Sequence, residues 1–336
     1  MNDSTVQNFL TLFSCCKVVK GYNRSTILDL QTQKIYIIPN SLGEFINKCK
    51  NSPYEEVLNC YNKEDKKTIK SYIDYLTNNN FCFFTETPDK FPDISTEWDH
   101  PSKITNAIID ISSHVHDFLY LNKQLSKLGC YSVEIRVFNK HDFSVYEKII
   151  AGFNNSRIKQ IILHIPYQVN LASSEIFDPL FFNQRLKAIY VHSLTKNIAE
   201  YSKNSVIYKH EKLIDASCCG KISRNNFLAN IDFYTESINH NNCLNRKISI
   251  DADGNIKNCP AMKASFGYYK KYDFNDIIST DKFQSNWDTT KDKISACADC
   301  EFRYSCLNCQ IITSDKNNMY SKPKHCGYDP YTSTWR

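Results

Sequence analysis

The sequence predicts an α/β protein in three parts: a winged-helix-like module over residues 1–95, a partial α/β barrel over 105–235 and a cysteine-rich domain over 236–336. Short strand-like runs and three small helical patterns fill the first part. In the second part, strand-like apolar runs recur roughly every 27 residues, which is the length of one β-loop-α unit. The third part is set apart by its cysteines, because nine of the 15 lie from Cys218 onward. A proline-containing linker over 88–105 separates the first two parts.

The composition is that of a globular protein, with 42% hydrophobic and 23% charged residues. No apolar run approaches the ~20 residues needed to span a bilayer, so no membrane partner is expected. Residues 1–4 lack the pattern of a signal peptide, which favours a cytoplasmic location where thiols stay reduced. The net charge of +5 is scattered along the chain, and without a clustered basic stripe no nucleic-acid binding is expected.

The first part is predicted to combine strands with three small helices. Strand-like segments cover residues 9–20, 26–30 and 34–38, and apolar residues at helical spacing follow over 42–49, 54–61 and 69–76. Two capping boxes are predicted at the first two helix starts, Ser41 with Glu44 and Ser52 with Glu55, the second with Pro53 at the first helical position. The cysteines of this part show no metal-ligand spacing and are predicted to behave as small hydrophobic residues: Cys15, Cys16, Cys49, Cys60 and Cys82.

Most strand candidates of the second part are continuous apolar runs, as expected for parallel strands covered on both faces. They span residues 106–111, 133–138, 160–165, 187–192, 205–209 and 230–233, with helices such as 118–128 between them. Such units predict an open or partial barrel whose working face lies at the C-terminal strand ends. The polar candidates there are Ser112, Ser113, His114, His116 and His192. They form no recognisable catalytic spacing, so a structural role is favoured for each.

A dense group of cysteines marks the third part: Cys297, Cys300, Cys306 and Cys309, followed by Cys326. Two cysteines three residues apart can turn both sulfurs toward one metal, and so dense a group leaves little chain for an apolar core. Metal ligation is therefore predicted. Zinc sites and iron–sulfur clusters both use four such thiolates, so the spacing alone does not choose between them.

Two further cysteines, Cys243 and Cys259, flank a predicted hairpin with strands over 247–251 and 256–258 and a turn at Asp253-Gly254-Asn255. Asp-Gly is a strong turn signal, and a hairpin returns its two ends to one place. These thiols are therefore candidates to bind one metal centre together. The total of seven thiols fits one closed four-ligand site and a second site with an open or non-cysteine position.

The arrangement of these seven cysteines around Asp253-Gly254, Cys259-Pro260 and the segment 297–304 resembles a SPASM domain. Such domains cap radical-SAM peptide maturases and bind auxiliary iron–sulfur clusters, so the resemblance implies two [4Fe–4S] clusters, with zinc as the alternative. The family's crossed ligation implies one cluster on Cys297, Cys300, Cys306 and Cys326, and the other on Cys243, Cys259 and Cys309.

The sequence departs from this family in three places. Cys306 and Cys309 are separated by two residues where the family usually has three, and the eighth cysteine is missing. Cys219 is a candidate for the missing ligand, and the alternative interpretation is that it is a buried thiol that binds no metal. The cysteine triplet C-x3-C-x2-C that follows the first barrel strand of radical-SAM enzymes is also absent, since residues 110–117 contain no cysteine. Ordinary radical-SAM activity and S-adenosylmethionine binding are therefore not expected.

A narrower resemblance is to the SPASM-domain peptide maturase of grasp-with-spasm systems. It is carried by Phe84-Thr85-Glu86, Phe91-Pro92, Trp98, the strand over 104–111 and the stretch 241–260. Such proteins are encoded with an ATP-grasp peptide ligase and a short precursor peptide, and the resemblance implies both as partners. In such enzymes a small winged helix typically binds the precursor's leader as an added strand.

Two functions follow from this resemblance. The first is a maturation enzyme that alters a ribosomally synthesised precursor peptide, by redox chemistry at an open cluster position. The second is a non-catalytic module that presents the precursor to the ligase, with the metal as a structural staple. A third hypothesis, a zinc-stapled regulator whose winged helix binds DNA, is disfavoured by the absence of a basic stripe.

Overall fold

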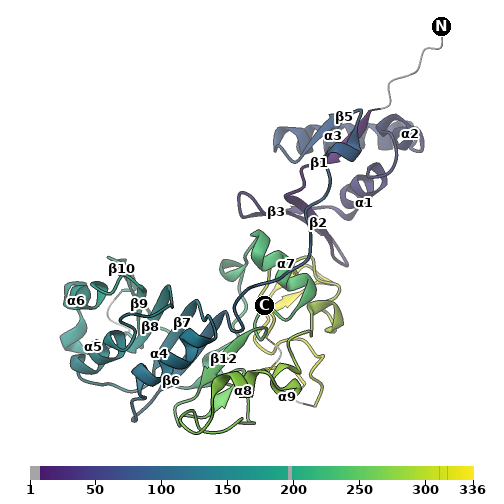
Figure 1. Ribbon diagram of the computed structural model, residues 1–336. Coiled ribbons are helices and arrows are strands. Elements are labelled where there is room, and N and C mark those ends of the chain that lie inside the picture. The colour runs from purple at the N-terminus through teal and green to yellow at the C-terminus, as the bar shows by residue number, and fades with distance from the viewer. Residues whose placement is uncertain (1–7, 196–198, 310, 316) are drawn as a thin grey trace. The chain divides into compact units, whose positions relative to one another are not determined.

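The computed structural model describes residues 8–195, 199–309, 311–315 and 317–336 (Figure 1). Residues 1–4, in which the sequence shows no signal-peptide pattern, lie outside the described residues. Of the helices described, none is both long and apolar enough to cross a membrane.

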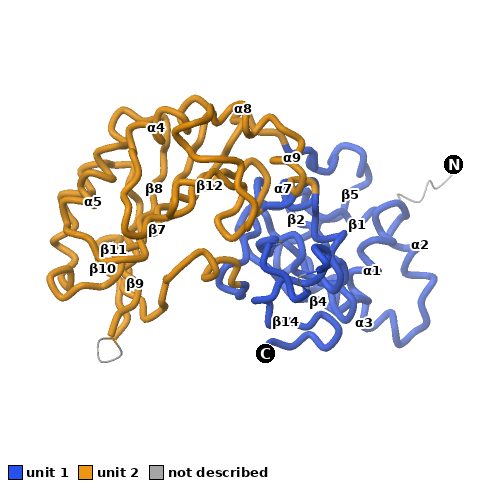
Figure 2. Tube along the Cα trace, turned by 90° about the horizontal axis from the view of Figure 1, so that it is seen from below, with its two compact units in different colours: residues 1–98, 222–242, 289–336 blue, residues 99–221, 243–288 orange. Residues whose placement is uncertain are grey.

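The chain forms two compact units, each assembled from segments that are distant in the sequence (Figure 2). Unit 1 comprises Met1–Trp98, Ile222–Asn242 and Thr289–Arg336, and unit 2 comprises Asp99–Lys221 and Cys243–Asp288. The cysteine-rich segment therefore contributes to both units. The three domain boundaries inferred from the sequence stay a prediction, because compactness does not establish which segments fold alone.

The first part of unit 1 combines two small antiparallel sheets with three helices. Its elements are β1 (Phe9–Leu12), β2 (Cys16–Lys20), β3 (Ser25–Asp29), β4 (Lys34–Ile38), α1 (Asn40–Cys49), α2 (Tyr54–Asn59), α3 (Lys63–Asn78) and β5 (Cys82–Thr85). β2, β3 and β4 pair in sequence order, and β1 pairs with β5. The strands predicted over 26–30 and 34–38 are confirmed, and they form the antiparallel pair β3 and β4. The predicted strand over 9–20 is wrong as a single strand, because a turn closed by the Cys16 N–H on the Phe13 carbonyl (2.8 Å) sends its halves into different sheets.

The starts of α1 and α2 differ from the predicted capping boxes. The residues before these helices are Pro39 and Pro53, and neither helix has a side-chain cap. A proline at this position presets the backbone entry into the helix and offers no side-chain acceptor. The predicted capping residues contact other groups: the Ser41 hydroxyl lies 2.7 Å from the Tyr72 hydroxyl, and Glu44 forms an exposed ion pair.

An apolar core joins the helices of this part to both sheets, with Phe45, Leu76 and Phe81 among its fully buried side chains. Three of the predicted hydrophobic cysteines lie in this core, Cys16, Cys49 and Cys82. Burial raises the pKa of the Cys49 thiol to about 12, so this thiol stays protonated at neutral pH. Such a thiol packs as a small apolar side chain.

Unit 2 is built around an eight-stranded sheet in the order β10-β11-β9-β8-β7-β6-β12-β13. Its strands are β6 (Asn106–Ile111), β7 (Ser132–Val137), β8 (Gln160–Pro166), β9 (Leu186–His192), β10 (Tyr201–Lys203), β11 (Val206–Tyr208), β12 (Lys247–Ile250) and β13 (Ile256–Lys257). The pairs from β11 to β12 are parallel, and the pairs at the two edges, β10 with β11 and β12 with β13, are antiparallel. Because β6 to β9 lie side by side in chain order, the sheet has the connectivity of a partial α/β barrel.

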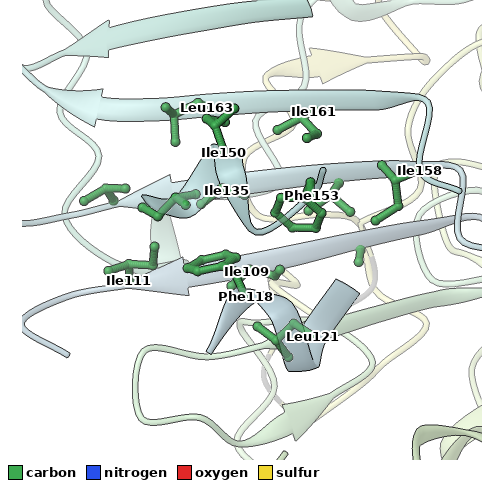
Figure 3. Close-up of a cluster of buried hydrophobic side chains, with 14 of the residues drawn as sticks. Ile109, Ile111, Phe118, Leu121, Ile135, Ile150, Phe153, Ile158, Ile161 and Leu163 are labelled. Atoms are coloured by element: carbon green, nitrogen blue, oxygen red, sulfur yellow. The ribbon is translucent and has the colours of Figure 1, made fainter. Parts of the chain in front are cut away.

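Helices cover one face of this sheet, which corrects the expectation of two covered faces. They are α4 (Phe118–Lys127), α5 (Phe143–Ala151), α6 (Asp178–Phe181), α8 (Phe274–Ile278) and α9 (Asp281–Gln284). Figure 3 shows Phe118 of α4 and Ile150 of α5 beside the strand residues Ile109 and Ile135. Side chains on the other face alternate with these and include Glu134, His164, Tyr190 and Lys247, all partly exposed. The strands therefore read as apolar runs interrupted by polar residues of the second face.

The last elements of unit 1 carry little regular structure. α7 (Ile231–Asn239) occupies the place of the predicted strand over 230–233, so that prediction was wrong. The Asn230 side chain accepts a hydrogen bond from the Phe233 N–H (2.9 Å) and caps the helix, a local signal that favours helix over strand. Beyond α7 the strands are β14 (Tyr328–Asp329) and β15 (Thr334–Trp335). Short 3-10 turns occur in both units, at Pro88–Lys90, Val169–Leu171, Ser174–Phe177, Ala216–Cys218, Arg224–Asn226 and Lys291–Lys293.

The sheet of unit 2 contains a buried ion pair whose loss we expect to destabilise the fold. Arg136 donates to both carboxylate oxygens of Asp110 at 2.7 and 2.8 Å, and the two side chains are 3% and 2% exposed. Replacing Asp110→Ala leaves a buried guanidinium unpaired, which costs about 3–5 kcal/mol of unfolding free energy. Chemical denaturation measures this loss.

The matched control for this prediction is Lys203→Ala, which removes one partner of the exposed Lys203–Glu175 ion pair. Water screens exposed ion pairs and they contribute little to stability, so the control is expected to unfold close to the unsubstituted protein. Equal denaturation midpoints for the two variants would contradict the prediction.

Candidate metal centre

Three cysteine thiols of unit 1, those of Cys297, Cys300 and Cys306, act on the ammonium group of one buried lysine, Lys291, and the thiol of Cys326 acts on two of these three. The Lys291 side chain is 3% exposed, and its Nζ lies 3.4 Å from the Cys306 Sγ and donates to the Leu307 carbonyl at 2.9 Å. The thiols that interact electrostatically with Lys291 or with one another are those of Cys297, Cys300, Cys306 and Cys326. The structure thus brings together the four residues that the resemblance assigns to one cluster, which we call the first thiol group. Their role as metal ligands stays a prediction.

Successive backbone turns place the cysteines of this group. The Cys300 N–H donates to the Cys297 carbonyl at 3.0 Å, and the Arg303 N–H donates to the Cys300 carbonyl at 3.2 Å. Each turn spans three residues, so it returns the chain to the same side and turns both cysteines of the Cys-x2-Cys pair toward one point. Cys326 arrives from a distant part of the chain, where it forms a parallel bridge with Ile222.

A second thiol group lies in unit 2 around Lys247, at the start of β12. The Lys247 Nζ is 3.5 Å from the Cys243 Sγ, and the thiols of Cys259 and Cys219 act on the same ammonium group. The β12–β13 hairpin closes as predicted, and the Asn258 side-chain amide ties its base by donating to the Lys247 carbonyl at 2.7 Å. The hairpin therefore returns its two flanking cysteines to one place.

The structure places Cys219 beside the second thiol group, whereas it does not test the predicted role of Cys309. Cys219 interacts electrostatically with Cys243, which places the candidate eighth thiol in the second group. Cys309 belongs to unit 1, and its assignment to the second cluster stays a prediction from the resemblance.

The two lysines are functional-site candidates that the sequence did not reveal. Burial by itself lowers the pKa of Lys291, but the thiols of Cys306, Cys297 and Cys300 outweigh burial and raise it above its usual value. Lys247 behaves in the same way beside its own thiols. A buried ammonium beside neutral thiols is an unpaired charge in a poor solvent, whereas thiolates or an anionic cluster neutralise it. Nothing in the spacing of Lys247 and Lys291 separates them from the other lysines.

When no metal is bound, the thiols of Cys297 and Cys259 are strongly biased toward the protonated form. Burial raises the pKa of Cys297 to about 11 and that of Cys259 to about 12, with smaller effects from neighbouring groups. Metal binding requires the thiolate and therefore releases protons. The positive lysine at each group lowers the cost of that deprotonation.

The sulfur atoms of each thiol group are spread over more than 4.8 Å. With Zn–S bonds of about 2.3 Å, tetrahedral geometry puts the sulfurs only ~3.8 Å apart. Among the described residues, three side chains that could bind a metal have ligand atoms all within 4.8 Å of one another: Cys15, Cys16 and Asp29. In neither thiol group do three sulfur atoms lie that close together. Iron–sulfur clusters place each thiolate on a different iron and so require wider spacing.

The tight group Cys15, Cys16 and Asp29 has an ordinary structural role. The Asp29 carboxylate accepts from the backbone N–H groups of Gln31 and Thr32, both at 3.0 Å, and from the Thr32 hydroxyl at 2.6 Å. These bonds cap the β3–β4 turn and occupy the oxygens that a metal would need. Burial raises the pKa of Cys16 to about 12, which keeps that thiol neutral.

The polar residues at the strand ends do not form a catalytic group with one another. His116 and His192 are buried, and burial lowers the pKa of both, so they are neutral at physiological pH. Their Nε2 atoms bond to backbone carbonyls, His192 to Val137 at 2.9 Å and His116 to Asp110 at 2.9 Å. The hydroxyls of Ser112 and Ser113 accept from the Asn139 amide at 3.0 and 3.3 Å, and His114 packs against His116.

Comparison with known proteins agrees with the geometry of the thiol groups. Residues 242–301 match the family described as SPASM, an iron–sulfur cluster-binding domain. The chain carries a SPASM domain. The matched segment includes the cysteines at 243, 259, 297 and 300, and the remaining three predicted ligands follow it.

Two solved structures resemble the chain over most of its length, and no curated protein sequence matches it. One is Streptococcus suis SuiB bound to S-adenosylmethionine, at 12% identity and a TM-score of 0.39, covering 94% of this chain and 98% of that one. The other is Streptococcus suis SuiB bound to the precursor peptide SuiA, at 10% identity and a TM-score of 0.35, covering 90% and 96%. That this chain does not use S-adenosylmethionine stays a prediction from the missing cysteine triplet.

Anaerobically purified protein is expected to contain iron and acid-labile sulfide. Two four-iron clusters would give about eight of each per chain. Cys306→Ala is expected to remove about half of the iron, because it deletes one ligand of one cluster. Cys60→Ala removes an exposed thiol of the first part and serves as the control. Zinc without sulfide would contradict the prediction.

The charge of Lys291 is expected to set the reduction potential of the adjacent cluster. Reduction adds negative charge, which a neighbouring ammonium stabilises, so Lys291→Met should shift the potential to more negative values. Redox titration followed by EPR measures the shift. Lys67→Met removes the same charge from an exposed position on α3 and should leave the potential unchanged. An equal shift in both variants would argue against a local effect.

Proposed function

We propose that this protein is a maturation factor for a ribosomally synthesised, post-translationally modified peptide. The observation that carries the proposal is that a chain with a SPASM domain also offers a peptide-sized groove beside an edge strand, β2, which pairs with another described strand on one side alone. The domain supplies the site for iron–sulfur clusters, which bring one-electron transfer when bound. The groove supplies a place for the precursor's leader.

The groove lies in unit 1 and has a volume of about 580 Å³. One wall is β2, which pairs with β3 on one side and with no other described strand. The opposite wall is α1, and the apolar residues between them are Leu12, Val18 and Ile46. An extended peptide can add to such a strand edge through main-chain hydrogen bonds, with its side chains in the pocket.

The charge of the groove favours an acidic leader segment. Four lysines line it, Lys17, Lys20, Lys48 and Lys50, against the two carboxylates of Asp93 and Glu44. Those carboxylates already pair with Lys17 and Lys20 at 2.8 and 2.9 Å. The positive charges of the other two lysines are therefore uncompensated by the carboxylates that line the groove, and they attract an anionic partner.

This function can take two forms: the protein either modifies the precursor itself or presents the precursor to a ligase that modifies it. In the first, the thiol groups would hold iron–sulfur clusters that supply one-electron transfer, an external electron donor or acceptor would complete the exchange, and the protein would change the bound precursor covalently. In the second, which the missing C-x3-C-x2-C triplet favours, the protein binds the precursor and an ATP-grasp ligase that performs the modification. Both forms need the groove, and only the first needs a redox-active cluster.

Charge reversal at the groove tests peptide binding. Lys48→Glu with Lys50→Glu is expected to weaken binding of the genomically associated precursor peptide by about tenfold, because the anionic leader then meets like charge. Fluorescence anisotropy with labelled precursor measures the affinity. The matched control reverses two exposed lysines on α3, Lys67→Glu with Lys70→Glu. Unchanged affinity in the groove variant would exclude this groove as the leader site.

Mass spectrometry of the precursor separates the two forms. If the protein is the catalyst, it alters the peptide's mass without the ligase, and Cys243→Ala abolishes that change while peptide binding persists. If it is an adaptor, the mass changes only when the ligase is added, and the three components form a complex. A precursor that binds neither the protein nor its complex with the ligase would overturn the proposed function.

A further inference from the structure

The turn between β2 and β3 is bonded to the segment that carries the first thiol group. The Tyr22 N–H donates to the Asp299 carbonyl at 2.8 Å, and the Thr26 hydroxyl donates to the Glu301 carbonyl at 2.8 Å. These two bonds lie on either side of Cys300. The backbone next to this predicted ligand is thus held by the groove-bearing sheet, within unit 1.

The contact is close enough to require a glycine. A Cβ on Gly21 would lie 2.8 Å from the Glu301 backbone nitrogen and 2.6 Å from the Arg24 carbonyl oxygen, both of them backbone atoms that cannot swing aside. The backbone at Gly21 and the backbone at Glu301 therefore approach so closely that there is no space for a side chain. A loose packing contact between independent domains would tolerate an alanine at this position.

A buried carboxylate fixes the same contact. The Glu301 side chain is fully buried, and Arg24 Nε lies 2.7 Å from its Oε1. Arg24 also donates to the Tyr328 hydroxyl at 3.1 Å, and that hydroxyl donates to Glu301 Oε1. Glu301 Oε2 is buried with no hydrogen-bond partner, so Arg24 is the cation on which this charge depends. Without Arg24, the carboxylate beside Cys300 would be buried with no cationic partner, and the Tyr328 hydroxyl would be its remaining side-chain donor.

A second arginine, Arg303, links β2 to the backbone of the predicted ligand Cys300. One Arg303 nitrogen, Nη1, donates to the Lys20 carbonyl at 2.6 Å and to the Cys300 carbonyl at 3.1 Å. Lys20 ends β2, the strand that borders the groove. The strand, the turn and the ligand segment therefore share one hydrogen-bonded network.

We propose that Arg24 is a positioning residue for the metal centre: through Glu301 it holds Cys300 in place, which makes the β2–β3 turn of the groove-bearing sheet a structural part of the first thiol group. This inference rests on metal binding by Cys297, Cys300, Cys306 and Cys326. Groups that orient metal ligands from outside typically change metal affinity 10–100-fold when removed. Arg24 occupies that place for Cys300, although it lies far from it in the sequence.

The test measures iron retention and EPR in the full-length protein, purified without oxygen. Arg24→Ala is expected to release iron to a ferrous chelator about tenfold faster than the unsubstituted protein, with an altered EPR signal for one cluster only. Arg24→Lys keeps the charge but loses the fork that reaches both Glu301 and Tyr328, so it should restore retention in part. Arg157→Ala, at an exposed position in unit 2, is the control for loss of an arginine.

Glu301→Gln keeps the proposal testable if Arg24→Ala folds poorly. It removes the charge that Arg24 neutralises while keeping the shape, so adding Arg24→Ala to it should cause less further iron loss than Arg24→Ala causes alone. Additive effects, or wild-type iron release and EPR in Arg24→Ala, would overturn the inference. An unsubstituted protein that binds no metal at the first thiol group would overturn the ligand assignment and the inference together.

Discussion

The ammonium group of Lys291 is buried beside the thiols of Cys297, Cys300 and Cys306, and a buried positive charge is costly unless a negative charge neutralises it. Protonated thiols cannot do this. Thiolates that carry a metal cluster can, and so the charge of one lysine argues for an anionic group at this position. In the other unit Lys247 lies beside Cys243, Cys259 and Cys219, but it is partly exposed and the Glu134 carboxylate also acts on it. Each thiol group therefore has a lysine ammonium beside it, on a different framework of the fold.

The two frameworks hold their thiols by different means. The second group uses regular structure, because the β12–β13 hairpin brings Cys243 and Cys259 together and Asn258 closes its base. The first group lies in a segment of consecutive turns with little regular structure of its own. Its rigidity has to come from outside, from the β2–β3 turn and from the buried Arg24–Glu301 pair. The proposed peptide site on β2 and the predicted metal ligand Cys300 thus depend on the same few backbone contacts.

The fold class was largely predictable, since four parallel strands of the sheet in unit 2 match the predicted runs to within one residue at each end. The spacing of apolar residues along a strand depends only on residues that are close in the chain, so it can be recognised in the sequence. The prediction of secondary structure failed where a short sequence pattern was compatible with two structures. Asn230 begins a helix where apolar neighbours suggested a strand, and prolines before α1 and α2 replaced the expected capping boxes. The polar second face of the sheet also went unnoticed, because single polar residues such as Glu134 and His164 barely interrupt an apolar run.

The sequence by itself determined the α/β class, the β12–β13 hairpin and the cysteine pattern that resembles a SPASM domain, because each depends on residues that are close in the chain. Only the tertiary structure decided which distant groups meet these cysteines. Lys291 and Lys247 look like any other lysine in the sequence, and Arg24 is separated from Glu301 by most of the chain. Their importance comes from burial and from charge at short range, and both are properties of the folded protein that no spacing records.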